Sequence, residues 1–362
     1  MNITPTTIGK RLEIARESRG YSQGELTKLT FFSQSQISKF ESGEKEISPL
    51  DLETLAQVLD YPKNFFYKKI SDLDVHLDFR KGKGVSAKTR RRILAIVNRT
   101  RYEVKNLLDQ IDLDPVVIPD KIISEKPIEA AKEIRKMWKI QDGPILDLIS
   151  KIENQSIITL PMKFANEDKF SACAIDVDSR QPLIIYNSNH PFDRIRFSVA
   201  HEIGHIFLHH HGETEFKDFS IPFEFREKDR EDQANTFASE FLMPENEMKK
   251  ELNGLTIEKL QRLKFKWRVS MAALLERAYR LNIIEYNKYL NFRKEFSSRR
   301  WLTNEPSEIP TEDPSLIKEI LTVLQDEFGY SIHDISSNLG LYPREFNSIY
   351  LGKVALRSVI SN

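Results

Sequence analysis

One short pattern in the sequence has the residue types and spacing of a hydrolytic metal site. His201 and His205 are four positions apart, and Glu202 follows the first of them directly. On a helix this spacing puts both imidazoles on one face, about one turn apart, so both can reach one metal ion. In zinc hydrolases two such imidazoles hold the metal, and the glutamate takes the proton from the metal-bound water. The alternative is a pair of hydrogen-bonded core histidines beside a surface glutamate.

A third ligand is expected on a second helix further along the chain. Between Asp229 and Pro244, apolar residues recur at positions 234, 237, 238, 241 and 242, which predicts one buried helix face. Glu231 lies one turn before this set and would complete a two-histidine, one-glutamate zinc site with a position open for water. Asn235 would orient a ligand through its amide. The alternative for Glu231 is a first-turn charge favoured by the helix dipole, and Asp232 and Asp229 are competing carboxylates.

These two stretches resemble a known family. The sequence Arg194-Ile-Arg-Phe-Ser-Val-Ala-His-Glu-Ile-Gly-His-Ile-Phe-Leu-His209 precedes Glu231-Asp-Gln-Ala-Asn-Thr-Phe-Ala-Ser-Glu-Phe-Leu-Met-Pro244. Together they are similar to the ImmA/IrrE family of zinc metallopeptidases, in which an R-F-x-x-A-H-E-x-G-H helix precedes an E-x-x-A-N-x-F-A-x-x-L-x-x-P helix. The resemblance implies that His201, His205 and Glu231 are zinc ligands and that Glu202 is the general base. It also implies action inside bacterial cells on DNA-binding repressors or antitoxin-like proteins.

Length and composition bound the class of protein. A chain of 362 residues is expected to form two or three domains, and 40% hydrophobic with 30% charged residues is a globular balance. No apolar run approaches the ~18 residues of a membrane span, and the N-terminus lacks a secretory pattern, so we expect a cytoplasmic protein without a membrane partner. The single cysteine, Cys173, fits a reducing compartment. We interpret it as buried apolar filler, with a metal-masking or redox role as the alternative.

The first 67 residues predict a domain of five short helices. Ser22 to Glu25 and Ser33 to Gln36 both have a helix-capping pattern, and they begin eleven residues apart, which fits a helix-turn-helix. In that motif the second helix enters the major groove with its first residues. We therefore expect phosphate contact by Gln23 and DNA contacts by polar residues of the second helix, namely Gln34, Ser35, Gln36, Ser38 and Lys39.

This segment resembles the XRE, or Cro/repressor-like, helix-turn-helix family. The resemblance rests on Tyr21-Ser-Gln-Gly-Glu-Leu26, Ser33-Gln-Ser-Gln-Ile-Ser-Lys-Phe-Glu-Ser-Gly43 and Pro49-Leu-Asp-Leu-Glu-Thr-Leu-Ala56. It implies a regulator that binds operator DNA, and a homodimer is consistent with it. The alternative is a helical bundle for protein contacts. Charge favours that alternative, because residues 1–66 contain eight Lys or Arg and nine Asp or Glu, a poor balance for phosphate affinity.

A basic stretch follows this domain. Residues 80–105 contain ten basic residues and one acid, Glu103. A helix is expected from Lys88 to Leu108, after a flexible joint at Gly82 to Gly84. The basic residues could add nonspecific DNA affinity, or they could form a solvated or domain-bridging face.

The remaining patterns complete the expected fold. Strand-like runs at 156–160, 172–177 and 183–186 predict a small antiparallel sheet over the cleft, whose exposed edge could take an extended substrate peptide. His209 to His211 are expected at the frayed end of the metal helix, where imidazole suits the negative end of the helix dipole, though His209 could contact the site. The acidic loop at 212–228 is expected to form a rim or lid over the cleft. Tyr186 and His190 are candidate oxyanion stabilisers only because they precede the metal helix. Residues 331–350 have helix-turn-helix spacing without a basic leading edge, so we expect packing or a partner contact there.

We therefore predict an α+β, mainly α protein with a zincin-like central domain. The predicted segments are a helix-turn-helix domain at 1–67, a basic helical connector at 68–126, a zinc metallopeptidase domain at 127–302, and a linker with a C-terminal helical unit at 303–362. The predicted function is a transcriptional regulator with zinc-dependent endopeptidase activity against a repressor or antitoxin-like protein. The alternative is a regulator or antitoxin whose metallopeptidase-like domain is a sensor or structural module. Glu202 favours the enzyme, because a structural metal site needs no base.

Overall fold

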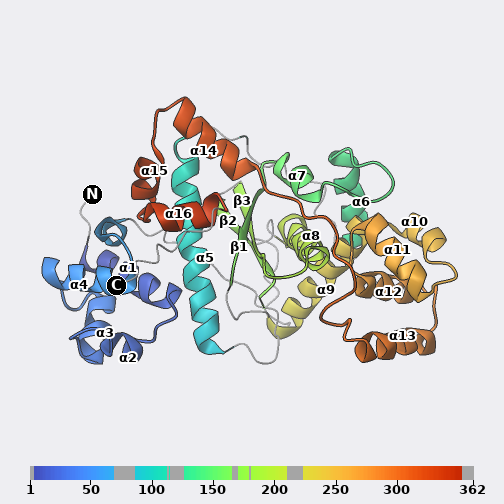
Figure 1. Cartoon of the computed structure of the whole chain (residues 1–362), viewed down its shortest axis with the longest axis horizontal. Helices are drawn as coiled ribbons and strands as arrows, with labels where there is room; N and C mark the ends of the chain where they lie inside the picture. The colour runs from blue at the N-terminus through green and yellow to red at the C-terminus, as the bar shows by residue number, and fades with distance from the viewer. Residues whose placement is uncertain are drawn as a thin grey trace, which may run out of the picture. The chain divides into compact units, whose positions relative to one another are not determined.

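The computed structural model describes residues 4–68, 86–111, 114, 126–164, 170–178, 181–209 and 223–352. The described chain is mainly helical, with one three-stranded sheet (Figure 1), as the predicted fold class requires. It divides into two compact units. The first contains residues 1–114, 175–180 and 316–362, and the second contains residues 115–174 and 181–315. None of the described helices is long and apolar enough to cross a membrane.

The N-terminal part of the first unit has the predicted short helices and caps. The side chain of Ser22 accepts from the Glu25 N–H at 3.1 Å while the Glu25 carboxylate accepts from the Ser22 N–H at 2.7 Å. Ser33 and Gln36 form the second capping box in the same way. These caps fix where two helices begin. The elements are α1 Pro5–Ser18, α2 Gln23–Thr27, α3 Gln34–Ser42, α4 Pro49–Leu59 and the 3-10 helix η1 Lys63–Tyr67.

One hydrophobic core holds these helices together, and it includes Leu12, Leu26, Ile37 and Leu55. Helices α1 and α3 approach so closely at Gly9 that a Cβ atom there would lie 2.2 Å from the carbonyl oxygen of Phe40. A side chain at this position would separate the two helices, so glycine is required there.

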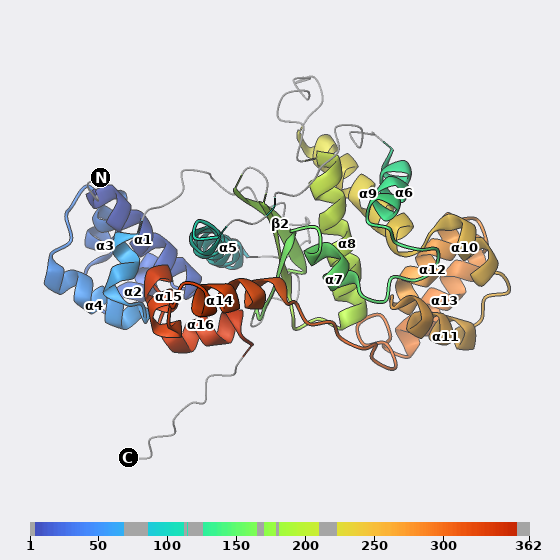
Figure 2. The same cartoon turned by 90° about the horizontal axis from the view of Figure 1, so that it is seen from above.

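Four more helices complete the first unit: α5 Ala87–Leu108, α14 Leu316–Asp326, α15 Ile332–Leu339 and α16 Pro343–Tyr350. Glu345 of α16 accepts two hydrogen bonds from Arg19 at 3.0 and 2.8 Å, and one from Arg99 of α5 at 2.8 Å. Asn64 donates to the Ser337 carbonyl at 2.7 Å. The C-terminal helices therefore pack against α5 and the helix-turn-helix region, as Figures 1 and 2 show.

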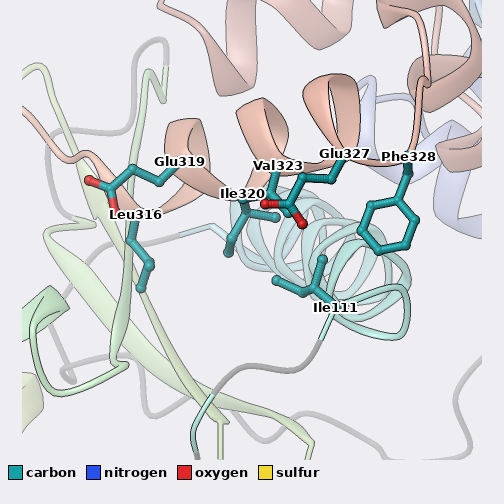
Figure 3. Close-up of a pocket in the computed structure, with 7 residues that line it drawn as sticks. All are labelled: Ile111, Leu316, Glu319, Ile320, Val323, Glu327 and Phe328. Atoms are coloured by element: carbon teal, nitrogen blue, oxygen red, sulfur yellow. The ribbon is translucent and has the colours of Figure 1, made fainter.

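A groove of about 350 Å³ lies between α14 and the C-terminal end of α5. Figure 3 shows apolar side chains in it, including those of Ile111 and Ile320, with the carboxylates of Glu319 and Glu327 beside them and Phe328 at one end. The described residues that line the groove include no imidazole, thiol or hydroxyl group. This groove therefore lacks the donor set that the predicted hydrolysis requires.

The remaining helices and the sheet belong to the second unit, apart from the end of β2, which belongs to the first. Helix α7 begins at Leu148, after a bend in which Gly143 has a φ of +102°. The elements are α6 Pro127–Met137, α7 Leu148–Glu153, β1 Ile158–Met162, β2 Ala172–Asp178, β3 Gln181–Asn187, α8 Phe192–His209, α9 Phe223–Leu242, α10 Glu245–Glu251, α11 Ile257–Trp267, α12 Met271–Arg280 and α13 Tyr286–Ser298.

The sheet is mixed, so the prediction of an antiparallel sheet is wrong. The strand order is β1-β3-β2, and β1 runs parallel to β3, with Ile158 opposite Leu183 and Met162 opposite Asn187. The pair β2 and β3 is antiparallel, and the Asn187 N–H donates to the Ser171 carbonyl at 2.8 Å. Every residue of β3 is buried. This apolar strand therefore takes the centre, and β1 is left as an edge strand beside it.

Candidate metal centre and DNA-binding helix

Helix α8 carries the histidine motif, and its buried face anchors it in the second unit. Val199, Ala200 and Ile203 are fully buried. Arg196, also buried, donates to the Arg268 carbonyl at 2.9 Å and forms an ion pair with Glu312. These contacts anchor α8 in the second unit. The histidines therefore project from a rigid element.

The three predicted metal ligands converge in the structure. The Nε2 atoms of His201 and His205 are 2.9 Å apart, and the oxygens of Glu231 lie 3.5 Å from the first and 3.2 Å from the second. A tetrahedral zinc with bonds of about 2.0–2.1 Å would separate its ligand atoms by about 3.3 Å. The spacing fits one zinc ion. Among the described residues, these three are the group of acidic, histidine and cysteine side chains that could hold a metal.

Two further side chains position the imidazoles. The Nδ1 atom of His201 is 3.0 Å from Oδ1 of Asn235, the residue predicted to orient a ligand. With the proton on Nδ1 donated to Asn235, Nε2 presents its lone pair to the metal position. The Nδ1 atom of His205 is 3.0 Å from Nδ1 of His209, whose Nε2 is 3.0 Å from Oε1 of Gln233. Both imidazoles therefore have an outer partner.

The sequence interpretation missed the roles of His209 and Gln233. His209 is four residues after His205, so helical spacing already placed it on the metal face. No pattern marked Gln233, because its contact depends on how α9 packs against α8. His210, His211 and residues 212–222 lie outside the described residues.

Glu231 does not lie in the first turn of its helix. Helix α9 begins at Phe223, so the helix-dipole alternative does not apply to this residue. Burial alone would raise the pKa of the Glu231 carboxyl, but hydrogen bonds and charge from His201 and His205 outweigh it and hold the pKa well below its usual range. The side chain is therefore ionised at neutral pH, as a metal ligand must be.

Glu202, the residue after His201, contacts the sheet. Its Oε2 atom accepts a hydrogen bond from the Ala174 N–H of β2 at 2.9 Å, and β2 is an edge strand.

The neighbouring Cys173 is buried. Burial, reinforced by the charge of Glu202, raises the pKa of its thiol well above the usual value. The thiol therefore stays protonated at neutral pH, which makes it a poor metal ligand and supports its interpretation as buried filler.

The two residues considered for the oxyanion differ in their surroundings. Tyr186 is buried, and its pKa is raised first by burial and then by the charges of Glu153 and Asp313. The Nε2 atom of His190 is 2.9 Å from the Phe170 carbonyl oxygen.

Gly204 allows the two ligand-bearing helices to approach. A Cβ atom at this position would lie 3.1 Å from the Cα atom of Ala234 and 3.2 Å from the ring of Phe237. Both contacts are tighter than ordinary van der Waals packing. Glycine between His201 and His205 therefore brings α9, and with it Glu231, within reach of the imidazoles.

We expect Gly204→Ala to lower the zinc affinity of the protein about tenfold and its stability by about 1–2 kcal/mol, since overpacking costs more than the helix propensity that alanine adds. Zinc titration against a chromophoric chelator and urea unfolding measure the two effects. Gly24→Ala is the matched control, because a Cβ atom at Gly24 meets nothing within 4 Å. Equal zinc affinity for both variants and the wild type would show that α8 and α9 need no glycine there.

The predicted DNA-contacting residues lie at the start of α2 and along α3. Gln34, Ser35, Ser38 and Lys39 are exposed on α3. Gln36 is partly buried, and its Oε1 atom accepts from the N–H and the hydroxyl group of Ser33. Of the predicted residues of α3, only Gln36 therefore also serves as a helix cap.

Gln23 has a structural contact as well as its place at the start of α2. Its amide donates to Glu41 at 2.8 Å, and the buried Arg16 pairs with the same carboxylate at 2.6 Å. These contacts hold the beginning of α2 against α3, the arrangement that a helix-turn-helix requires.

The fold and the two groups of residues define a regulator-like protein with a helix-turn-helix domain and a metallopeptidase-type domain. Comparison with known families gives the same two parts. Residues 12–66 match the helix-turn-helix family model, and residues 153–279 match the peptidase family model described as the IrrE N-terminal-like domain. A search of curated proteins found no match. The fusion predicted from the sequence is therefore confirmed.

Proposed function

We propose that this protein is a DNA-bound zinc endopeptidase that cleaves a partner repressor or antitoxin-like protein in the cytoplasm. The observation that carries the proposal is the convergence of two imidazoles and one carboxylate, with Glu202 on the same helix. When bound to His201, His205 and Glu231, zinc would polarise a peptide carbonyl and lower the pKa of its water toward ~7. An intact glutamate beside the ligands is what separates a catalytic site of this kind from a structural one.

The residues around the metal position suit proteolysis. Glu202 would accept a proton from the attacking water and give it to the leaving amine. Its partner, the Ala174 N–H, lies on an edge strand of the sheet. An extended peptide that added to this edge would pass beside Glu202. Asn235 and His209 keep the imidazoles oriented while substrate binds.

The helix-turn-helix domain supports the DNA-binding half of the proposal. Gln34, Ser35, Ser38 and Lys39 are exposed on α3, where the motif presents side chains to base edges. Gln36 and Gln23 lie at the beginnings of α3 and α2, next to the expected phosphate positions. Binding to an operator would hold the peptidase domain near other regulators bound to the same DNA.

Substitution of one metal ligand tests the proposal. We expect Glu231→Gln to lower zinc affinity by at least about 100-fold and to abolish cleavage of the partner protein. Metal content is measured on the purified protein, and cleavage is measured by proteome-wide labelling of new N-termini in cells that express each form. Asp232→Asn is the matched control, because it removes the same charge from the next, exposed residue of α9.

The outcomes distinguish an enzyme from a sensor or structural module. The peptidase is supported if the purified wild type contains zinc and the cells that express it contain one shortened protein, and if both are absent for Glu231→Gln. If the wild type binds zinc but no new N-terminus depends on Glu231, proteolysis is contradicted. That result would favour a regulator that uses the domain as a sensor or for stability.

A further inference from the structure

The basic stretch before the second unit has two parts with different surroundings. In the second part, the side chain of Arg99 is 4% exposed and pairs with Glu103 at 3.0 Å and with Glu345 at 2.8 Å. Arg101 is also buried and donates to the Asp176 carbonyl. These arginines stabilise the first unit from inside. They are therefore not available for binding a polyanion.

The first turns of α5 present their basic residues to solvent. Lys88, Arg90 and Arg91 are exposed, and Arg92 is partly buried. Lys88, Arg91 and Arg92 lie against the turn between α1 and α2, and Arg91 is 3.7 Å from the Glu17 carboxylate. Arg90 is exposed on another face of the same turn of α5. Lys88 is 2.6 Å from the Glu25 carboxylate, and a Cβ atom at Gly20 would lie 3.3 Å from the side chain of Arg92.

The start of α5 is therefore next to the start of α2. Glu25, the partner of Lys88, is itself the capping residue that accepts from the Ser22 N–H. A shallow recess at this point is lined by residues from both regions: Glu17, Gly20, Tyr21, Ser22, Lys88, Arg91 and Arg92.

The place of this cluster in a helix-turn-helix decides what it could bind. When α3 occupies the major groove, the preceding helix crosses the phosphate backbone. Side chains beside the beginning of α2 then face phosphates that flank the bases read by α3. The basic residues at the start of α5 also offset the net negative charge of the helix-turn-helix domain. Residues 1–66 have eight basic and nine acidic residues, a formal charge of −1, and adding Lys88, Arg90, Arg91 and Arg92 gives +3.

We propose that the first turns of α5 form a phosphate-binding extension of the helix-turn-helix domain, in which Arg91 contacts the DNA backbone beside the bases and Arg90, exposed on the same turn, neutralises a neighbouring phosphate. Lys88 offsets the negative charge of Glu25 at the same place, so that this carboxylate does not repel the phosphates. The inference rests on the proposed DNA binding. It adds a sequence-independent contribution to affinity that α3 does not supply.

The salt dependence of DNA binding tests this extension. For B-DNA, the slope of log K against log salt falls by about 0.9 for each phosphate that the protein no longer neutralises, so Arg90→Gln with Arg91→Gln should reduce the slope by about 1.8 and weaken binding at least about tenfold at 0.1 M salt. The probes are a 30-base-pair duplex of mixed sequence and a duplex that the wild type selects from a random pool. Binding is measured by fluorescence anisotropy from about 0.05 to 0.3 M salt.

Two matched variants complete the experiment. Lys63→Gln with Lys318→Gln removes the same charge from exposed positions elsewhere in the first unit, and it should leave the slope within about 0.5 of the wild type. Gln34→Ala with Ser38→Ala should weaken binding to the selected duplex more than to the mixed one. Circular dichroism checks that each variant keeps its helices.

The results separate the extension from the proposed function. An equal decrease in affinity for both duplexes with a smaller slope for the α5 variant supports the extension. If the α5 variant binds DNA with the affinity and salt slope of the wild type while the α3 variant binds more weakly, the extension is overturned. The helix-turn-helix assignment would remain intact. Failure of the wild type to bind either duplex would overturn both.

Discussion

Replacement of Glu202 by glutamine is expected to slow hydrolysis of the partner protein by at least about 10³-fold, within the range of general acid–base catalysis, and to leave the zinc content unchanged. Glutamine keeps the size of the side chain but cannot accept the proton of the attacking water. Its amide oxygen can still accept from the Ala174 N–H, so the local structure should be kept. Because Glu202 is not among the three converging ligands, metal binding does not depend on it.

Initial rates of cleavage of the purified partner and metal analysis of the same samples measure these two effects. Glu276→Gln is a suitable control, since it makes the same change at a half-exposed position of α12, where Glu276 pairs with Arg280. If the Glu202→Gln variant kept more than a tenth of the wild-type rate, another group would have to remove the proton. If it did not retain zinc, the change in rate would not report on the base.

A second large effect is expected in the first unit, where Glu345→Gln should lower the free energy of unfolding by about 3 kcal/mol at pH 7. The carboxylate of Glu345 joins Arg19, the residue after α1, to Arg99 of α5, and Arg99 is buried. Removing its charge leaves the buried Arg99 with fewer anionic partners. The substitution should therefore weaken the packing of the C-terminal helices on the rest of this unit.

The effect should depend on pH in a defined direction. Burial alone would raise the pKa of Glu345, but Arg99 and Arg19 outweigh it and hold the pKa at about 2, against an ordinary value of 4.5. A depressed pKa contributes stability that is complete above about pH 4.5 and is lost as the pH falls toward 2. About 2 kcal/mol of the difference between wild type and variant should therefore be gone at pH 3.

The positions of the tryptophans allow the two units to be followed separately. Trp138, Trp267 and Trp301 all belong to the second unit, so tryptophan fluorescence reports on that unit while far-ultraviolet circular dichroism reports on both. Glu345→Gln should shift the dichroism transition in urea and leave the fluorescence transition in place. Asp60→Asn is the control, because Asp60 and Arg344 form an exposed pair, which contributes less than about 1 kcal/mol. Equal transitions for Glu345→Gln and wild type would contradict the expected stabilisation.

Local chemistry made much of this structure predictable. The capping boxes at Ser22 and Ser33 appear where the sequence places them, because a cap needs only residues three positions apart. The same holds for the apolar face of α9 and for the histidine pair on α8, whose spacing follows from helix geometry. Glu231 was found because it shares that apolar face, and its proximity to both imidazoles follows from packing of that face against α8.

Features that depend on distant contacts were not predictable in this way. The order and direction of the strands depend on which strand is most completely buried, and alternation within one strand does not carry that information. Arg99 and Arg90 look alike in the sequence, yet one pairs with Glu345, 246 residues away, and the other is exposed. The steric role of Gly204 likewise depends on Ala234 of a different helix.

The pairing of the C-terminal helices with the N-terminal domain has a topological consequence. Since residues 1–114 and 316–362 belong to the same unit, the peptidase domain is an insertion, with a covalent tether at each end. A single nick in either tether would not set the DNA-binding part free, because the other tether would still join the two. Release by proteolysis would need two cuts, or one cut together with disruption of the interface around Glu345, and in both cases loss of the contact between Arg101 and the Asp176 carbonyl of residues 175–180.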